Sequence, residues 1–124
     1  MRLSLPVICA IGLSLAGCES PSDPLICTAI GVDAIVVTVL DGASNQRICD
    51  ATVTAVEGSF SQELRRFAAG TDCTYSGPPE RAGVYEVRVT KTGYAPVTTS
   101  NVRVTADECH VIPVRLTVTL NRTS

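Results

Sequence analysis

Hydrophobic and polar residues alternate with a period of two over several stretches of this chain, a pattern typical of half-buried β-strands. The clearest stretch is 84–90, and 51–56 and 97–104 follow the same pattern. The positions expected to face the core are Ala51, Val53 and Ala55; Tyr85, Val87 and Val89; and Val102 and Val104. The strand 97–104 is expected to bend near Asn101.

Two further stretches predict strands of a different kind. Residues 35–40 are apolar at almost every position, which predicts a strand covered on both faces. The longest alternating run is 112–120, with Ile112 at the start of its apolar face. Pro113 lacks an N–H group, so it must lie at a bulge or where the strand has no neighbour on that side.

Turn-forming residues separate these stretches. Residues 60–67 fit either a strand or a single helical turn, and the glycines and prolines of 69–82 predict a loop. Gly93 is expected to supply a positive φ in a tight turn. Many short strands without a convincing helix indicate an all-β, antiparallel sandwich.

The first 17 residues differ from the rest of the chain. Arg2 precedes an apolar run that ends at Leu15, which is shorter than the roughly 20 residues of a membrane span and typical of a secretory signal. The motif Leu15-Ala16-Gly17-Cys18 resembles the lipobox of bacterial lipoproteins. That resemblance implies diacylation of Cys18 and cleavage directly before it, whereas an ordinary signal with an incidental cysteine is the alternative.

The expected organisation therefore has three parts: a lipoprotein signal peptide over 1–17, a lipidated tether over 18–26, and a folded domain over 27–124. The tether is polar and contains two prolines, which suits a short, extended linker. Glu19 follows Cys18 where an aspartate serves as a retention signal in enteric lipoproteins. This difference favours the outer membrane over the inner one.

Four cysteines remain once Cys9 leaves with the leader and Cys18 is acylated. An even number in an exported domain predicts two disulfides, and three pairings are possible. We favour Cys49–Cys73, because the turn at Gly58 sends the chain back alongside the strand that begins after Cys49.

Several short motifs follow one another in the order seen in the carboxypeptidase regulatory-like domain, which this chain resembles. They are 37–42, ending in Asp41-Gly42; 50–53; 82–87, containing Gly83; 92–94, ending in Gly93-Tyr94; and the closing strand after 102–104. The resemblance implies a transthyretin-like (prealbumin-like) Greek-key sandwich of about seven strands. Residues 43–46 depart from the family, which often has a Gly-Pro or Gly-Lys-Pro step there.

The resemblance has two further implications. The first and last strands of such a sandwich are neighbours that run the same way, which favours the disulfide Cys27–Cys109. In metallocarboxypeptidases this domain is an appendage and the zinc chemistry sits in a separate domain, so no catalytic activity is implied here.

Candidate chemistry is sparse. His110 is the only histidine, so a zinc site with two histidines cannot form and a Ser-His-Asp triad could use only His110. Lys91 is the only lysine, and we interpret it as a solvated surface residue near a turn. Asp41, Asp107 and Glu108 could hold calcium weakly, but turn capping is the favoured role. There is no basic run of the kind that binds nucleic acid. We therefore expect no catalytic residues, no cofactor, no metal and no nucleic-acid partner.

The sequence thus favours a non-catalytic, lipid-anchored protein of the bacterial cell envelope with a structural or protein-interaction module. Its expected partners are the membrane, through the lipid on Cys18, and an envelope protein or a glycan. A carbohydrate-binding module is the alternative, because sandwiches of this kind accompany glycan-active enzymes. Exposure of Tyr75 and Tyr94 as sugar platforms distinguishes the two hypotheses.

Overall fold

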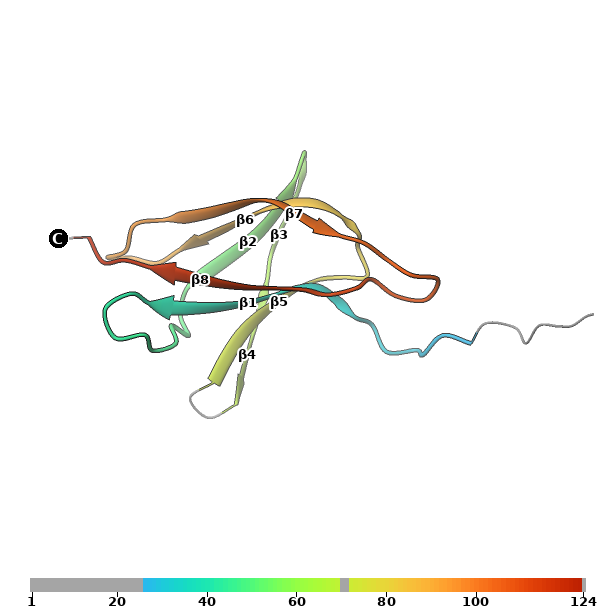
Figure 1. Ribbon diagram of the computed structural model, residues 1–124, viewed down its shortest axis with the longest axis horizontal. Helices are drawn as coiled ribbons and strands as arrows, with labels where there is room; N and C mark the ends of the chain where they lie inside the picture. Colours follow the sequence, from blue (N-terminus) through green and yellow to red (C-terminus); the bar gives the residue numbers. More distant parts are fainter. Residues whose placement is uncertain (1–25, 70–71, 124) are drawn as a thin grey trace, which may run out of the picture.

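Eight strands form two four-stranded sheets that pack face to face in the computed structural model, which describes residues 26–69 and 72–123 (Figure 1). The strands are β1 (Asp33–Asp41), β2 (Thr52–Glu57), β3 (Phe60–Glu63), β4 (Arg65–Ala69), β5 (Asp72–Pro79), β6 (Gly83–Thr90), β7 (Val97–Val104) and β8 (Val114–Leu120). The predicted all-β sandwich is therefore confirmed, with eight strands rather than about seven.

The strand order is β4-β5-β1-β8 in the first sheet and β3-β2-β6-β7 in the second. Neighbouring strands run antiparallel except for β1 and β8, which pair in parallel from Ile35 opposite Val114 to Asp41 opposite Leu120. The first and last strands thus lie side by side and run the same way, as the family resemblance implies.

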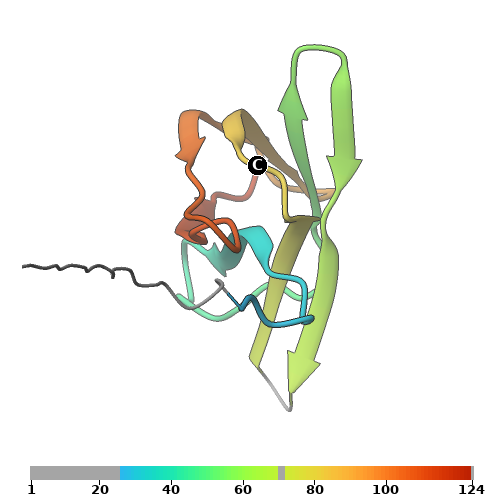
Figure 2. The same ribbon diagram turned by 90° about the vertical axis from the view of Figure 1, so that its right-hand side faces the viewer.

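β3 and β4 form one extended run that passes from the second sheet to the first at Leu64 (Figure 2). β3 pairs with β2 and β4 pairs with β5. Leu64 is buried at the crossing and donates its N–H to the carbonyl of Val53 at 2.8 Å. Of the two alternatives for 60–67, the strand is therefore correct and the helical turn is wrong.

β5 contradicts the loop predicted for 69–82. It pairs with both β1 and β4, although it ends in Gly77-Pro78-Pro79. A Cβ atom at Gly77 would lie 3.2 Å from Cδ2 of Leu64. Gly77 also has a φ of 140°, which side chains rarely adopt, so its backbone conformation and the close approach of the crossing chain both favour glycine.

The core lies between the sheets and contains most of the predicted inward-facing residues. The inward-facing positions predicted within 51–56, 84–90 and 97–104 are all buried except Ala51, which packs at the margin of the core. On the apolar face predicted for 112–120, Val118 and Leu120 are buried, whereas Val114 and Leu116 are half-buried. Tyr75 and Tyr85 are the largest fully buried side chains. The bend at Asn101 is also confirmed, because this residue has a φ of 58°, and Gly93 has the expected positive φ of 87°.

Two expectations about burial are wrong. β1 is covered on one face only: Val36, Thr38 and Leu40 are half-buried, because β1 gains its neighbours β5 and β8 within the sheet and not from a third layer. Ile112 is 51% exposed, because β8 begins at Val114 and the preceding segment leaves the sheet.

Candidate functional site at the Cys27–Cys109 end

The two disulfides lie at opposite ends of β1. Cys27–Cys109 joins the segment before β1 to the loop before β8, with 5.2 Å between the Cα atoms. Cys49–Cys73 joins the segment after β1 to β5, with a Cα separation of 5.7 Å. This is the pairing that the sequence analysis favours. Cys18, the signal peptide 1–17 and most of the tether lie outside the described residues.

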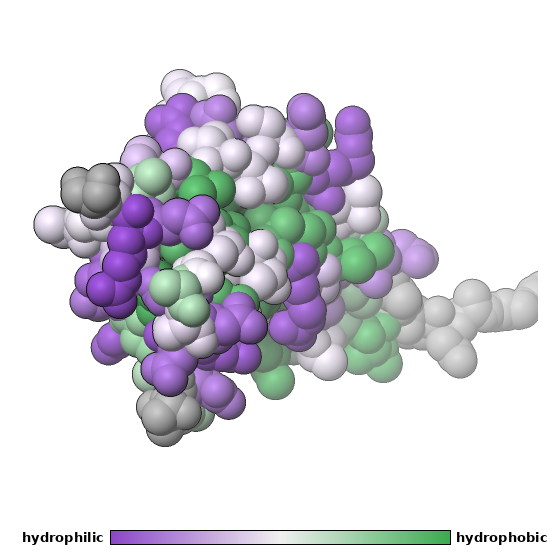
Figure 3. Space-filling view, turned by 60° about the vertical axis from the view of Figure 1, so that its left-hand side comes forward, coloured by the Kyte–Doolittle hydropathy of each residue, from purple (hydrophilic) through white to green (hydrophobic). Residues whose placement is uncertain are grey.

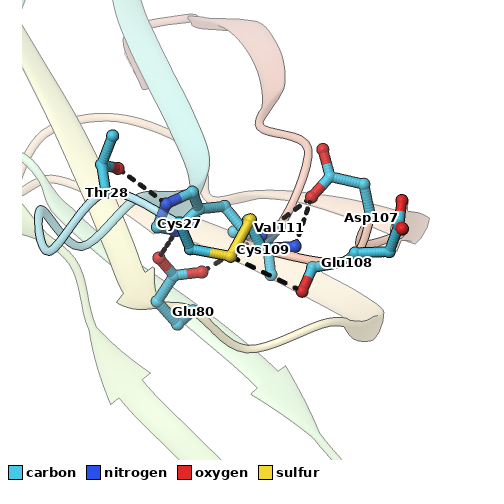
Figure 4. Close-up of a disulfide and its surroundings, with 8 residues drawn as sticks. Cys27, Thr28, Glu80, Asp107, Glu108, Cys109 and Val111 are labelled. Carbon is cyan, nitrogen blue, oxygen red and sulfur yellow. Dashed lines mark hydrogen bonds and ion pairs between the residues drawn. A yellow bond between two sulfur atoms is a disulfide. The ribbon is translucent and has the colours of Figure 1, made fainter. Parts of the chain in front are cut away.

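The carboxylate of Glu80 is the centre of the Cys27–Cys109 end (Figure 4). Its Oε2 accepts the N–H of Val32 at 3.0 Å and contacts Nδ1 of His110, and its Oε1 accepts the N–H of Val111 at 3.1 Å. The hydrogen bond with His110, followed by those with the backbone, lowers the pKa of Glu80. This one side chain therefore ties the segment before β1 to the loop before β8.

Asp107 shapes the same loop. Its Oδ1 accepts the N–H groups of Cys109 at 2.8 Å and His110 at 2.9 Å, and these bonds lower the pKa of the carboxyl group. The favoured turn-capping role of Asp107 is thus the one found. The cap fixes Cys109 in the position from which it reaches Cys27.

Thr28, His110 and Glu80 form a chain of hydrogen bonds. Nε2 of His110 lies 2.8 Å from Oγ1 of Thr28, and Nδ1 faces Glu80. The order hydroxyl, imidazole, carboxylate is that of a hydrolytic triad, which also needs N–H donors for an oxyanion. The N–H groups of Val32, Cys109, His110 and Val111 already donate to carboxylates. These four donors are not free for that task.

Sequence reasoning missed Thr28 and Glu80 as partners of His110. Glu80 lies within the stretch 69–82 that was interpreted as a loop, and Thr28 lies 82 positions from His110. No spacing rule connects residues that far apart, so only the fold brings them together. An open hollow of about 420 Å³ lies beside them, lined in part by Ile30, Ala106 and His110.

The Cys49–Cys73 end is organised by Tyr75, which is 2% exposed. Its hydroxyl donates to the carbonyl of Ile48 at 2.8 Å and accepts the N–H of Ala51 at 3.0 Å. Arg66 on β4 donates to the carbonyl of Cys49 at 2.7 Å. The segment between β1 and β2 is therefore held to β4 and β5 by hydrogen bonds as well as by the disulfide.

Asp41 caps the turn at the end of β1. Its Oδ2 accepts the N–H and the hydroxyl of Ser44 at 2.8 Å each, and its Oδ1 accepts the hydroxyl of Tyr94 at 2.7 Å and Nε of Arg122 at 3.3 Å. These contacts, with Tyr94 the strongest, hold the pKa of Asp41 far below its usual range. Asp41 and Asp107 cap turns at opposite ends of the sandwich, so they do not form one calcium site.

The tyrosines proposed as sugar platforms are occupied in the fold. Tyr75 is buried, and Tyr94 is half-buried with its hydroxyl on Asp41. Phe60 lies under the guanidinium of Arg81, whose Cζ is 3.7 Å from the ring centroid. Phe67, on β4, is half-exposed. Among the aromatic side chains of the described residues, only Phe67 is exposed enough to serve as a sugar platform of a carbohydrate-binding module.

Within residues 26–69 and 72–123, no group of three or more metal-binding side chains lies close enough to hold an ion. The same part of the chain contains no helix that is long and apolar enough to cross a membrane. No protein-family model and no curated protein matches this chain.

Proposed function

We propose that this chain is a lipid-anchored protein of the bacterial cell envelope whose β-sandwich serves a structural or protein-interaction role. The anchor is the acylated thiol of Cys18, and the domain follows it after a tether of a few residues. The lipobox-like sequence Leu15-Ala16-Gly17-Cys18 supports the anchor.

The observation that carries the proposal is the pair of disulfides. Cys27–Cys109 and Cys49–Cys73 use every cysteine after Cys18, and disulfides persist in oxidising compartments outside the cytoplasm. A cytosolic domain of this size would keep its thiols reduced. The leader and the disulfides therefore support export independently of each other.

A non-catalytic role fits the hydrogen bonding at both ends of the sandwich. At the Cys27–Cys109 end, Glu80 and Asp107 each accept two backbone N–H groups. At the other end, the hydroxyl of Tyr75 bridges two backbone groups. These side chains hold segments in place, which is the work of a scaffold.

Replacement of Cys18 tests the anchor. Cys18→Ser should abolish incorporation of labelled fatty acid and leave an uncleaved precursor, because the serine hydroxyl cannot replace the thiol that is acylated. Cys9→Ser is the matched control, since Cys9 lies within the leader and should label normally. Normal labelling and mature size of Cys18→Ser would overturn the proposal.

A further inference from the structure

Large hydrophobic side chains are exposed at the end of the sandwich where the described chain begins. Five such side chains are exposed in the described part of the chain, and Ile26, Ile30 and Ile112 are three of them, at 86%, 77% and 51%. The Cys27–Cys109 disulfide brings the first two to the same end as the third. Figure 3 shows hydrophobic residues at the edge of the domain on this side.

We propose that Ile26, Ile30 and Ile112 dock this end of the sandwich on the bilayer that holds the acyl chains. This inference rests on the proposed function. The eight residues 18–25 span at most about 26–29 Å when fully extended. They join the domain directly at Ile26, so this end is held nearest to the lipid.

The chemistry of the surface specifies the lipid that it fits. Isoleucine side chains enter the interfacial region of a bilayer, and burial of one such side chain strengthens partitioning roughly tenfold or more. Asp107 and Glu108 are exposed in the loop that precedes Ile112. Acidic side chains are repelled by anionic headgroups, so the docking surface matches zwitterionic lipid.

The chain contains no tryptophan, so a single introduced tryptophan reports on one position. We place it at Ile30 or Ile112 in separate variants, and at Phe67 as the matched control. Phe67 is also exposed, at 50%, but it lies away from the start of β1. It pairs with Thr74, near the beginning of β5, whereas the start of β1 pairs with Pro79 at the end of β5. Each mature acylated variant is reconstituted in phosphatidylcholine vesicles with brominated acyl chains, which quench tryptophan on contact.

Ile30→Trp and Ile112→Trp should lose most of their emission, whereas Phe67→Trp should keep it. Replacing phosphatidylcholine by phosphatidylglycerol should weaken the quenching. Retention of both disulfides, checked by non-reducing peptide mapping, reports that each variant is folded. Equal quenching of Phe67→Trp and Ile112→Trp by the brominated lipid would overturn the docking. Shielding of Ile112→Trp from both brominated lipid and aqueous iodide would also overturn it, because a protein would then cover this surface.

The failure of docking is distinguishable from the failure of the proposed function. The mass of each variant shows whether Cys18 carries acyl chains. Acylation without quenching overturns the docking alone. Absence of acylation overturns the proposed function, and the same variants added to preformed vesicles then decide the docking separately.

Discussion

The two disulfides differ in the loops that they close and in the burial of their sulfur atoms, and these differences oppose each other. Cys27–Cys109 spans 82 residues and Cys49–Cys73 spans 24. Chain entropy alone predicts losses of about 4.5 and about 3.5 kcal/mol when they are removed. Cys27 is exposed, but Cys73 is 2% exposed, so Cys73→Ser also buries a hydroxyl at a cost of about 1–3 kcal/mol.

We therefore predict that Cys49→Ser/Cys73→Ser is destabilised at least as much as Cys27→Ser/Cys109→Ser, despite its shorter loop. Both losses are large against a total stability of about 5–15 kcal/mol. Urea unfolding followed by circular dichroism measures each free energy of unfolding relative to the oxidised wild type. If the Cys49→Ser/Cys73→Ser variant loses about 1 kcal/mol less free energy of unfolding than the Cys27→Ser/Cys109→Ser variant, loop entropy alone determines the order. That result would refute the burial argument.

Three further predictions concern single residues. Tyr75→Phe should cost about 1–3 kcal/mol in urea unfolding, because it leaves the buried carbonyl of Ile48 without its donor, and an unchanged midpoint would contradict the bridge. Contacts in the folded state lower the pKa of Asp41, so its contribution to stability is complete above about pH 4 and is lost as the pH falls further. Asp41→Asn should therefore make the melting temperature fall less steeply at acidic pH than in the wild type. An equally steep fall would exclude Asp41 as a contributor. Gly93→Ala should cost about 1–2 kcal/mol because of its φ of 87°, whereas Gly31→Ala, at a site with equally open space, should be neutral; equal losses would argue against backbone strain.

The alternating strands could be predicted from the sequence because one face of each is buried. Val53, Val87 and Val102 each follow the period of two and each is buried. β5 could not be predicted, because Gly77 and the prolines after it have the composition of a turn. Their place in a strand depends on pairing with β1, where Ile35 lies opposite Gly77 and Asp33 opposite Pro79, and such a long-range pairing has no local signal in the sequence.

The hydrogen bonds of the candidate site were harder to predict from the sequence than the pairing of the cysteines. Cysteine pairing could be argued because only three pairings were possible: the turn at Gly58 favoured Cys49–Cys73, and the family resemblance implied Cys27–Cys109. Glu80 carries no such restriction: it is one of 12 acidic residues, and its partners Val32 and Val111 contribute only backbone N–H groups. Backbone donors have no sequence signature, so a site built from them becomes visible only in the fold.

The position of Cys27 has a mechanical consequence. Any pull on the residues before it reaches a covalent bond to Cys109 before it reaches the first residue of β1, Asp33. The force then enters the sandwich at two neighbouring points, because β1 and β8 lie side by side in parallel and begin at this same end. The two strands are drawn in the same direction and do not slide past each other. Tension from the N-terminal side is thus shared between β1 and β8, because the disulfide links the segments that precede these two strands.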